Sequence, residues 1–247
     1  MRVLGTLLVA ALLATPVVIS AQRGRGAAAP QTARDAAALD LTGYWVAVIT
    51  EDWKFRMVTP NKGVFDALPL NPEGRRVGDT WDPARDEAAG EQCKAYTAAG
   101  VMRLPGRLHI AWQDANTLKV ETDAGTQTRL FRFGAAAAAG ESSWQGHSVA
   151  QWEYAGRGRG GETLGNLKVV TTNLRAGYVR KNGAPHSDKA VVTEYFDLNT
   201  APNGDQWMTI TTKVDDPIYF RAPYITTTDF KKQPTAAGWN PTACAAR

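Results

Sequence analysis

Histidine and cysteine are scarce in this chain, which has three histidines and two cysteines among 247 residues. His109, His147 and His186 show neither the H-x-H nor the H-E-x-x-H spacing of a transition-metal site. The acidic turn Asp215-Asp216-Pro217 also lacks the ligand spacing of an EF-hand calcium loop. We therefore expect no metal ion and no other cofactor.

The chain also lacks a glycine-rich phosphate loop. The nearest candidate, residues 157–161 (RGRGG), has neither the following helix nor the Lys-Ser/Thr pair that such loops need. The formal net charge of +4 is small, and a single Gly/Arg stretch is more typical of a flexible loop than of an RNA-binding segment. We therefore expect no nucleic-acid partner.

Only one long hydrophobic run is present, and it lies at the N-terminus. Residues 3–19 follow Arg2, contain Pro16 and lead into the small pair Ser20-Ala21. The run is short for a membrane span. Residues 1–21 are therefore expected to be a cleaved signal peptide, with an uncleaved anchor as the alternative. We expect a periplasmic or secreted protein with no transmembrane segment after cleavage.

Large apolar side chains are almost absent from residues 22–39. Such a segment cannot bury enough surface to offset the entropy lost on ordering, so we expect a flexible Ala/Gly/Arg-rich linker there. The length of residues 40–247 suits one domain. We expect a single β-barrel-like domain over this range.

The two cysteines, Cys93 and Cys244, lie far apart in the sequence. In an oxidising compartment such a pair is expected to form a disulfide that ties the C-terminal tail to the middle of the chain. Two free thiols are the alternative, because spacing alone does not show that the residues meet.

Most of the chain after Leu41 alternates apolar and polar residues with a period of two, which is typical of half-buried strands. Turn clusters such as Asp123-Ala124-Gly125 and residues 199–205 separate them. The last strand is expected to be an edge strand or a bent strand, because Pro223 interrupts it. The expected strands are residues 41–50, 54–58, 101–104, 107–114, 117–122, 126–133, 146–154, 166–173, 190–198, 206–214 and 219–230.

Helices between these strands are lacking, and parallel strands would need long crossovers, mostly helical. The expected fold class is therefore mainly β, an antiparallel meander closed or strongly curved into a lipocalin-like barrel. Residues 70–96 are the exception. Pro72-Glu73 and Asp82-Pro83 have the pattern of helix starts, so we expect a short helical insertion that covers one end or edge of the sheet.

Ser148 lies in a stretch one residue short of the G-x-S-x-G motif of serine hydrolases, because Ala150 stands at the last position. A nucleophile elbow needs a helix directly after the serine. Here residues 149–154 continue the strand pattern. We therefore interpret Ser148 as a strand residue.

Two of the expected strands place a charge beside aromatic residues. Glu194 shares its face with Val192 and Phe196, and Arg129 shares its face with Phe131. A carboxylate on an apolar face is costly unless it is paired, so a structural pair is expected, with a site acid as the alternative. A polar spot in an apolar barrel is also the usual design of a small-ligand pocket. The residues expected to line it are Trp112, Arg129, Phe131, Trp152, Glu194 and Phe196.

An acid–base function is the alternative reading of three residues. His186 lies in the loop of residues 182–188 beside Asp188, where a base can lie close to an acid. His147 shares a polar strand face with Glu153, which is more typical of a surface position. The possible acid–base residues are therefore His147, His186 and Glu194.

The second half of the chain resembles a large group of uncharacterised secreted bacterial proteins, found in acidobacteria and some proteobacteria. Its consensus runs roughly W-x-G-x-S-x-G-x-W-E-G-D-T, then G-x-P-H-S, V-x-E-R-F and T-x-x-D-P. The matching stretches are Pro72-Glu73-Gly74-Arg75, Trp81-Asp82-Pro83, Cys93, Trp144 to Ser148, Trp152-Glu153, Leu167 to Asn173, Asn182 to Asp188, Val192 to Glu194 and Thr212 to Pro217.

This chain departs from the group where residues 154–165 replace the acidic W-E-G-D-T turn with a longer loop. The resemblance implies a secreted protein of this class and supplies no reaction. A second resemblance is Gly43-Tyr44-Trp45, which is similar to the G-x-W of lipocalin-type barrels.

Three functions are consistent with the sequence. The first is a secreted or periplasmic β-barrel protein that binds a small, partly apolar ligand. The second is an enzyme that acts on a small organic or carbohydrate substrate by Glu/His acid–base chemistry. The third is a cell-envelope accessory protein without a ligand, which would have a filled core and an exposed apolar patch.

Overall fold

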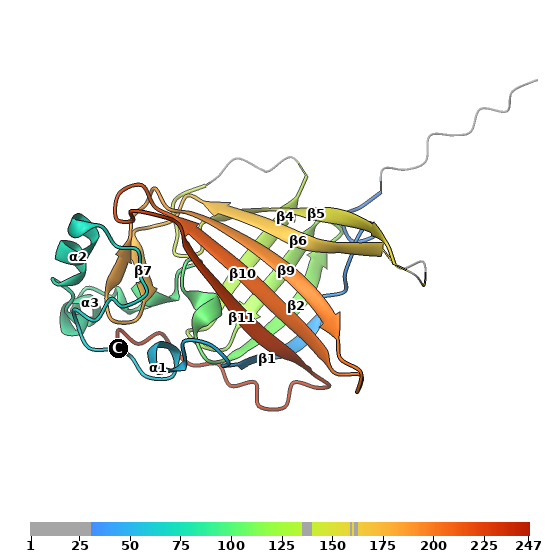
Figure 1. Ribbon diagram of the computed structural model, residues 1–247, viewed down its shortest axis with the longest axis horizontal. Helices are drawn as coiled ribbons and strands as arrows, with labels where there is room; N and C mark the ends of the chain where they lie inside the picture. Colours follow the sequence, from blue (N-terminus) through green and yellow to red (C-terminus); the bar gives the residue numbers. More distant parts are fainter. Residues whose placement is uncertain (1–30, 135–139, 159, 161–162) are drawn as a thin grey trace, which may run out of the picture. The chain divides into compact units, whose positions relative to one another are not determined.

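The computed structural model describes residues 31–134, 140–158, 160 and 163–247 (Figure 1). The expected signal peptide, residues 1–21, and the first part of the expected linker, residues 22–30, lie outside the described residues.

Nine strands close into a barrel, in the order β1-β11-β10-β9-β6-β5-β4-β3-β2 (Figure 1). The mainly β, lipocalin-like fold class expected from the alternating pattern is confirmed. The barrel strands are β1 (Gly43–Val48), β2 (Arg107–Asp114), β3 (Thr117–Thr122), β4 (Gln127–Phe133), β5 (His147–Arg157), β6 (Thr163–Thr172), β9 (Val191–Thr200), β10 (Gln206–Asp215) and β11 (Tyr224–Gln233).

Two features interrupt the simple meander. Strands β4 and β5 are parallel, with Phe131 opposite Ser148, while the other barrel pairs are antiparallel. A parallel pair needs a long return connection, which agrees with the separation in the sequence between the end of β4 at Phe133 and the start of β5 at His147. Strand β6 pairs with β9 because β7 (Gly177–Arg180) and β8 (Ala184–His186) leave the barrel and form a separate two-stranded sheet.

The barrel interior is filled by the inward-facing half of each strand. Along β9 and β10 buried positions alternate with partly exposed ones, as the period of two predicts. Trp45, Phe131, Leu167, Phe196 and Phe230 belong to the interior cluster, and each is 0–1% exposed. A second apolar cluster, which includes Phe65, Leu70, Leu174, Val192 and Val214, lies where the helical segments meet the barrel.

Short helices gather at one end of the barrel, which we call the helical end (Figure 1). The insertion expected over residues 70–96 contains α2 (Pro72–Gly78), α3 (Pro83–Ala88) and η1 (Gln92–Tyr96). Asn71 and Asp82 cap α2 and α3 by accepting hydrogen bonds from backbone N–H groups, and a proline occupies the first turn of each helix. No helix in the described ranges is long and apolar enough to cross a membrane.

Two expected strands were assigned wrongly, and the last expected strand forms but is not an edge strand. Residues 53–56 form the helix α1 (Trp53–Arg56), and residues 101–103 form the 3-10 helix η2 (Val101–Arg103). Runs of four or five residues are too short for their period to separate a strand from a helical turn. The final strand is not at an edge, because β11 pairs with both β10 and β1 and begins at Tyr224, directly after Pro223.

Residues 31–39, expected to be part of a flexible linker, are instead held against the other end of the barrel. Trp152 Nε1 donates a hydrogen bond to the carbonyl of Ala33 at 2.8 Å. The backbone N–H of Arg34 donates to the carbonyl of Ala115 at 3.0 Å. Backbone groups of the segment thus find partners on the barrel, a source of order that side-chain composition does not reveal.

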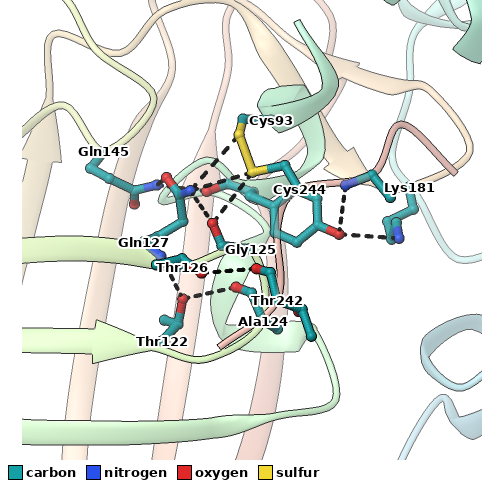
Figure 2. The surroundings of a disulfide bond; sticks show 12 residues. Cys93, Thr122, Ala124, Gly125, Thr126, Gln127, Gln145, Lys181, Thr242 and Cys244 are labelled. Atoms are coloured by element: carbon teal, nitrogen blue, oxygen red, sulfur yellow. Dashed lines mark hydrogen bonds between the residues drawn. A yellow bond between two sulfur atoms is a disulfide. The ribbon is translucent and has the colours of Figure 1, made fainter. Parts of the chain in front are cut away.

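The expected disulfide between Cys93 and Cys244 is formed, and it joins η1 to the C-terminal tail (Figure 2). Beside it, the N–H of Thr242 donates to the carbonyl of Asp123, and the hydroxyl of Thr126 donates to the carbonyl of Thr242 at 2.9 Å. The tail is thus fastened to η1 by the covalent bond and to the β3–β4 turn by hydrogen bonds.

Candidate functional site

Arg129 on β4 and Glu194 on β9 meet inside the barrel, as the shared faces of their strands predict. Arg129 donates from Nη1 and Nη2 to the two carboxylate oxygens of Glu194, at 2.8 and 2.6 Å. Both side chains are 0% exposed. Nη2 of Arg129 also donates to the hydroxyl of Thr171 at 3.1 Å. The pair is bidentate and closed off from solvent, which is the arrangement of a structural ion pair.

Aromatic side chains pack around this pair. The ring centroids of Phe131 and Phe196 lie 5.5 Å apart, edge to face, and the guanidinium of Arg129 lies 4.9 Å from the centre of the Phe131 ring. Phe131 and Phe196 are 0% exposed. Four of the six residues expected to line a pocket are therefore brought together, as part of the packed barrel interior.

The other two, Trp112 on β2 and Trp152 on β5, lie together near the end covered by residues 31–39. Their ring centroids are 6.5 Å apart, and Phe133 packs against both. All three side chains are partly buried and pack against the interior cluster. The structure therefore separates the expected set into a buried ion-pair layer and an aromatic layer.

Ser148 is an interior strand residue. It lies on β5, is 2% exposed, and its hydroxyl hydrogen-bonds the hydroxyl of Thr171 at 2.8 Å. Its neighbour His147 begins the same strand and points to the opposite face, because successive side chains of a strand alternate.

His186 on β8 is 1% exposed, and both ring nitrogens have partners. Nδ1 lies 3.0 Å from the carbonyl of Ser187 and therefore carries the proton, which leaves Nε2 to accept from the hydroxyl of Thr97 at 2.9 Å. Burial lowers the pKa of His186, and the Ser187 carbonyl offsets part of that effect. The imidazole is therefore neutral at pH 7 and held in one orientation. Within the described residues no hydrogen bond joins it to Glu194 or His147.

A cleft of about 230 Å³ opens beside His186, at the helical end. Helices α2 and α3, the 3-10 helix η1 and the sheet β7–β8 form its walls, and Figure 1 shows α2, α3 and β7 together at this end. The lining residues are Val77, Thr80, Trp81, Asp82, Arg85, Asp86, Lys94, Ala176, Gly177, Tyr178, Pro185, His186 and Tyr219.

Glycine allows the walls to approach closely. Gly183 has φ +79°, and a Cβ there would lie 2.2 Å from the Cβ and Cγ of Trp81. A Cβ on Gly177 would lie 2.6 Å from the methyl group of Thr97. Gly183 thus allows the indole of Trp81 to pack against the β7–β8 turn. Gly177 allows β7 to pack closely against Thr97 and the imidazole of His186.

Asp216 fastens the loop after β8 to the loop after β10. Its carboxylate accepts from the backbone N–H and the hydroxyl of Ser187, the latter at 2.8 Å. It also accepts from the backbone N–H groups of Ile218 and Tyr219 at 2.9 and 3.3 Å. The motif residues around Trp81, Gly183 to Ser187 and Asp216 thus converge on one side of the cleft.

The polar wall of the cleft is a network centred on Asp86. One carboxylate oxygen accepts from Lys94 Nζ at 2.9 Å and the other from the hydroxyl of Tyr178 at 2.8 Å. Burial and the Asp86 charge raise the pKa of Tyr178 well above its usual value, so its hydroxyl stays protonated and donating. Burial alone would lower the pKa of Lys94, but its hydrogen bonds to Glu91 and Asp86 raise it. The ammonium is therefore charged at neutral pH.

One of the residues that line the cleft, Trp81, has a donor without an acceptor in the part of the chain that the structure describes. Trp81 is 6% exposed, and its buried Nε1–H finds no hydrogen-bond partner among the described residues. A buried unpaired donor costs about 1–3 kcal/mol, which an acceptor on a ligand would recover.

Among the described residues no group of three or more His, Cys, Asp or Glu side chains could hold a metal ion. The cleft instead offers aromatic and aliphatic walls, one free indole donor and a fixed cation, which suits non-covalent recognition.

Comparison of the chain with protein-family models, with curated proteins and with solved structures gives no match.

Sequence reasoning missed this cleft, because its residues come from five separate elements. Trp81-Asp82-Pro83 was visible only as a motif, and Tyr178, Lys94 and Tyr219 carried no local signal. Only the packing of α2, α3 and η1 onto β7–β8 brings these side chains together.

Proposed function

We propose that this chain is an extracytoplasmic β-barrel protein that binds a small, partly apolar ligand in the cleft at the helical end. The observation that carries the proposal is the combination, in one cleft, of aromatic walls with the unpaired indole N–H of Trp81. The barrel interior is a weaker candidate, because both carboxylate oxygens of Glu194 are paired with Arg129 there and both side chains are closed to solvent.

The size and walls of the cleft indicate the ligand class. Trp81, Tyr178, Tyr219, Pro185 and Val77 supply apolar and aromatic surface. Pockets for drug-sized molecules measure about 300–1,000 Å³, so a cleft of about 230 Å³ suits a smaller, single-ring molecule. The indole N–H calls for a hydrogen-bond acceptor on that ring or beside it.

The compartment is part of the proposal. The Cys93–Cys244 disulfide is typical of oxidising compartments, and the pattern of residues 1–21 is typical of a signal peptide. We also place the chain with the secreted bacterial group that it resembles. The stretches that carry the resemblance at Trp81, Gly183 to Ser187 and Asp216 line or support the cleft.

The acid–base alternative has less support. Glu194 is fully paired with Arg129, and both ring nitrogens of His186 have partners. General acid–base catalysis needs a group free to exchange a proton with the substrate.

A cell-envelope accessory protein is the second candidate, and one observation favours it. Trp53, Met57 and Val58, in and after α1, are 58–66% exposed, so three large apolar side chains lie close together on the surface. Such a patch is typical of a contact surface.

The proposal is tested by adding single-ring probes to the ¹⁵N-labelled, oxidised protein and following the tryptophan indole resonances by NMR. Phenol, benzoate, indole and glucose serve as probes, and Trp81→Phe assigns the Trp81 signal. We expect at least one probe to shift the Trp81 resonance saturably. Shifts confined to Trp112 and Trp152 would place binding at the other barrel end and overturn this site.

A matched pair of variants makes the test specific. Ala176 is an exposed residue that lines the cleft, and Ala236 is an exposed residue of the C-terminal tail. Ala176→Phe should fill the cleft and abolish the shift, whereas Ala236→Phe should bind like the unaltered protein. If no probe shifts any indole signal, the ligand proposal fails and the accessory candidate takes its place.

A further inference from the structure

Three buried arginines from distant parts of the sequence line one small cavity at the helical end. Arg56 ends α1, Arg103 ends η2 and Arg180 ends β7. Each is only 7–8% exposed. The cavity measures about 30 Å³, and Lys181 also lines it.

Each guanidinium is held in place by partners that use only some of its N–H groups. Arg56 donates from Nε to the carbonyl of Arg103 at 2.9 Å and pairs through Nη1 with Glu51. Arg103 donates from Nη2 to Asp52 at 2.8 Å. The guanidinium orientations are therefore set by contacts other than the cavity.

The cation from β7 is oriented in the same way. Arg180 donates from Nη2 to the carbonyl of Asp66 at 3.1 Å, and its guanidinium lies 4.4 Å from the centre of the Phe55 ring. Phe55 itself lines the cavity. Together with Arg56 and Arg103, Arg180 thus forms part of a preorganised cationic wall.

One guanidinium nitrogen of each arginine has no hydrogen-bond partner within the described part of the chain. Nη2 of Arg56, Nη1 of Arg103 and Nη1 of Arg180 are buried and have no hydrogen-bond partner among the described residues. Unpaired buried donors on charged groups are costly, and native proteins rarely keep several in one place. Three unpaired donors on the arginines of one cavity indicate an acceptor that several cations share.

Positive charges outnumber negative charges around the cavity, which also favours an anion. Three guanidinium groups face two carboxylates, Glu51 and Asp52, which are 29% and 36% exposed and therefore partly screened by water. Burial lowers the pKa of Arg56, and repulsion from Arg103 adds to the effect. The group of like charges is destabilising until an anion offsets it.

We propose that this cavity is a binding site for one small oxyanion, held by the free N–H groups of Arg56, Arg103 and Arg180. Arginine presents its donors in a planar fork that matches carboxylate and phosphate oxygens. One water molecule needs about 10–15 Å³ of such cavity space, so a cavity of about 30 Å³ has room for a small inorganic anion or a single acid group and not for a larger body.

The site is distinct from the ligand cleft, although the two share a wall. Gly177 and Tyr178 of β7 line the cleft, whereas Val179 and Arg180 of the same strand line the arginine cavity. In η1, Lys94 lines the cleft and the next residue, Ala95, lines the arginine cavity. The oxyanion proposal therefore does not depend on the ligand proposal.

Isothermal titration calorimetry of the full-length, oxidised protein tests the proposal, with inorganic phosphate, sulfate and acetate as probes in a buffer of constant ionic strength. We expect saturable binding of at least one probe with a stoichiometry of one. A preference for phosphate and sulfate identifies a tetrahedral anion, and a preference for acetate identifies a carboxylate. No saturable binding of any probe overturns the proposal.

Variants then locate the site. Arg180→Gln and Arg56→Lys should each weaken binding at least tenfold, the second because the ammonium keeps the charge but loses the fork. Arg76→Gln is the matched control, because the Arg76 side chain is 66% exposed and pairs with Glu73 on α2. Equal binding by Arg180→Gln and Arg76→Gln would mean that the anion binds elsewhere, and the proposal would be wrong.

Thermal unfolding gives a second readout that does not depend on the calorimeter. Phosphate or sulfate should raise the Tm of the unaltered protein and of Arg76→Gln, and leave the Tm of Arg180→Gln unchanged. If Arg180→Gln fails to fold, Arg56→Lys carries the same comparison. A rise of equal size in all variants would indicate a general salt effect and would contradict the site.

Discussion

Arg129 and Glu194 form a bidentate ion pair that spans the interior of the barrel. Their strands, β4 and β9, are separated by β5 and β6 in the barrel order. The pair therefore links two strands that share no backbone hydrogen bonds. The hydroxyls of Thr171 and Ser148 extend this polar layer through hydrogen bonds of 3.1 and 2.8 Å. The same pair was expected from the shared strand faces alone.

Removal of one partner of this pair should be far more costly than removal of both. Glu194→Gln leaves a buried guanidinium without a counter-charge and should lower the free energy of unfolding by roughly 3 kcal/mol. The double variant Arg129→Met with Glu194→Leu should lose much less, because neither buried charge is left. Urea denaturation measures both.

The control for this prediction is an exposed pair. Glu73 and Arg76 form an ion pair whose side chains are 49% and 66% exposed. Glu73→Gln should therefore change the free energy of unfolding far less than Glu194→Gln does. If Glu194→Gln lowered the free energy of unfolding as little as Glu73→Gln, the buried pair would not contribute to stability.

Reduction of the disulfide should destabilise the whole domain. Cys93 and Cys244 are 151 residues apart in the sequence. In the loop-entropy model a crosslink of this span stabilises the folded state by about 5 kcal/mol. The double variant Cys93→Ala with Cys244→Ala should unfold at a clearly lower urea concentration than the oxidised protein, and match the protein kept in dithiothreitol.

Hydrogen exchange separates this effect from local loosening of the tail. If only residues 240–247 lost protection in the double variant while the urea midpoint stayed the same, the disulfide would merely fasten the tail. Loss of protection along β3 and β4 as well is the expected result, because the tail is hydrogen-bonded to Asp123 and Thr126.

Acidification should weaken the fold through His186. Its folded-state pKa lies below the ordinary value of 6.5 because the imidazole is buried. Below pH 6.5 the unfolded chain takes up a proton that the folded chain does not, so this contribution is complete above pH 6.5 and is lost as the pH falls below it.

His186→Asn isolates the effect, because the other two histidines are present in both proteins. Urea denaturation at pH 7.5 and pH 5.5 should show a larger loss of stability on acidification for the unaltered protein than for the variant. An equal loss in both would mean that the imidazole is protonated in the folded state. At pH 7.5 the variant itself should be less stable by about 1 kcal/mol, because the hydroxyl of Thr97 loses its shorter hydrogen bond and keeps only the carbonyl of Tyr178 at 3.5 Å.

A methyl group at Gly183 should separate the cleft walls. Gly183 and Gly204 both have positive φ, +79° and +86°, but only Gly183 faces an obstacle, the indole of Trp81 at 2.2 Å. Gly204→Ala has open space and should lose only about 1 kcal/mol from backbone strain. Gly183→Ala should lose a further 1–3 kcal/mol or so from overpacking.

The indole signal of Trp81 reports the same change directly. In Gly183→Ala the Trp81 resonance should shift or broaden, whereas in Gly204→Ala it should not. Equal stability losses with an unshifted Trp81 signal would mean that the turn relaxes without moving the indole, and the role assigned to Gly183 would be wrong.

Features with a local periodicity or a local capping pattern were predictable from the sequence. The alternation along β9 and β10 placed Glu194 and Phe196 on the inner face, and the structure buries both. Asn71-Pro72 and Asp82-Pro83 start helices because the cap and the proline act within one turn. The disulfide was expected from a count of two cysteines, but its formation depends on the fold that brings η1 to the tail.

Only the tertiary structure decided the features made by residues distant in the sequence. The parallel pairing of β4 with β5, the docking of residues 31–39 on the barrel, the cleft around Trp81 and the cavity of Arg56, Arg103 and Arg180 have no repeating pattern. Each arginine in isolation has the sequence context of a surface residue. The three become a single charged site only because the closed barrel and its helical end exclude water around them, and that depends on long-range packing rather than on local sequence.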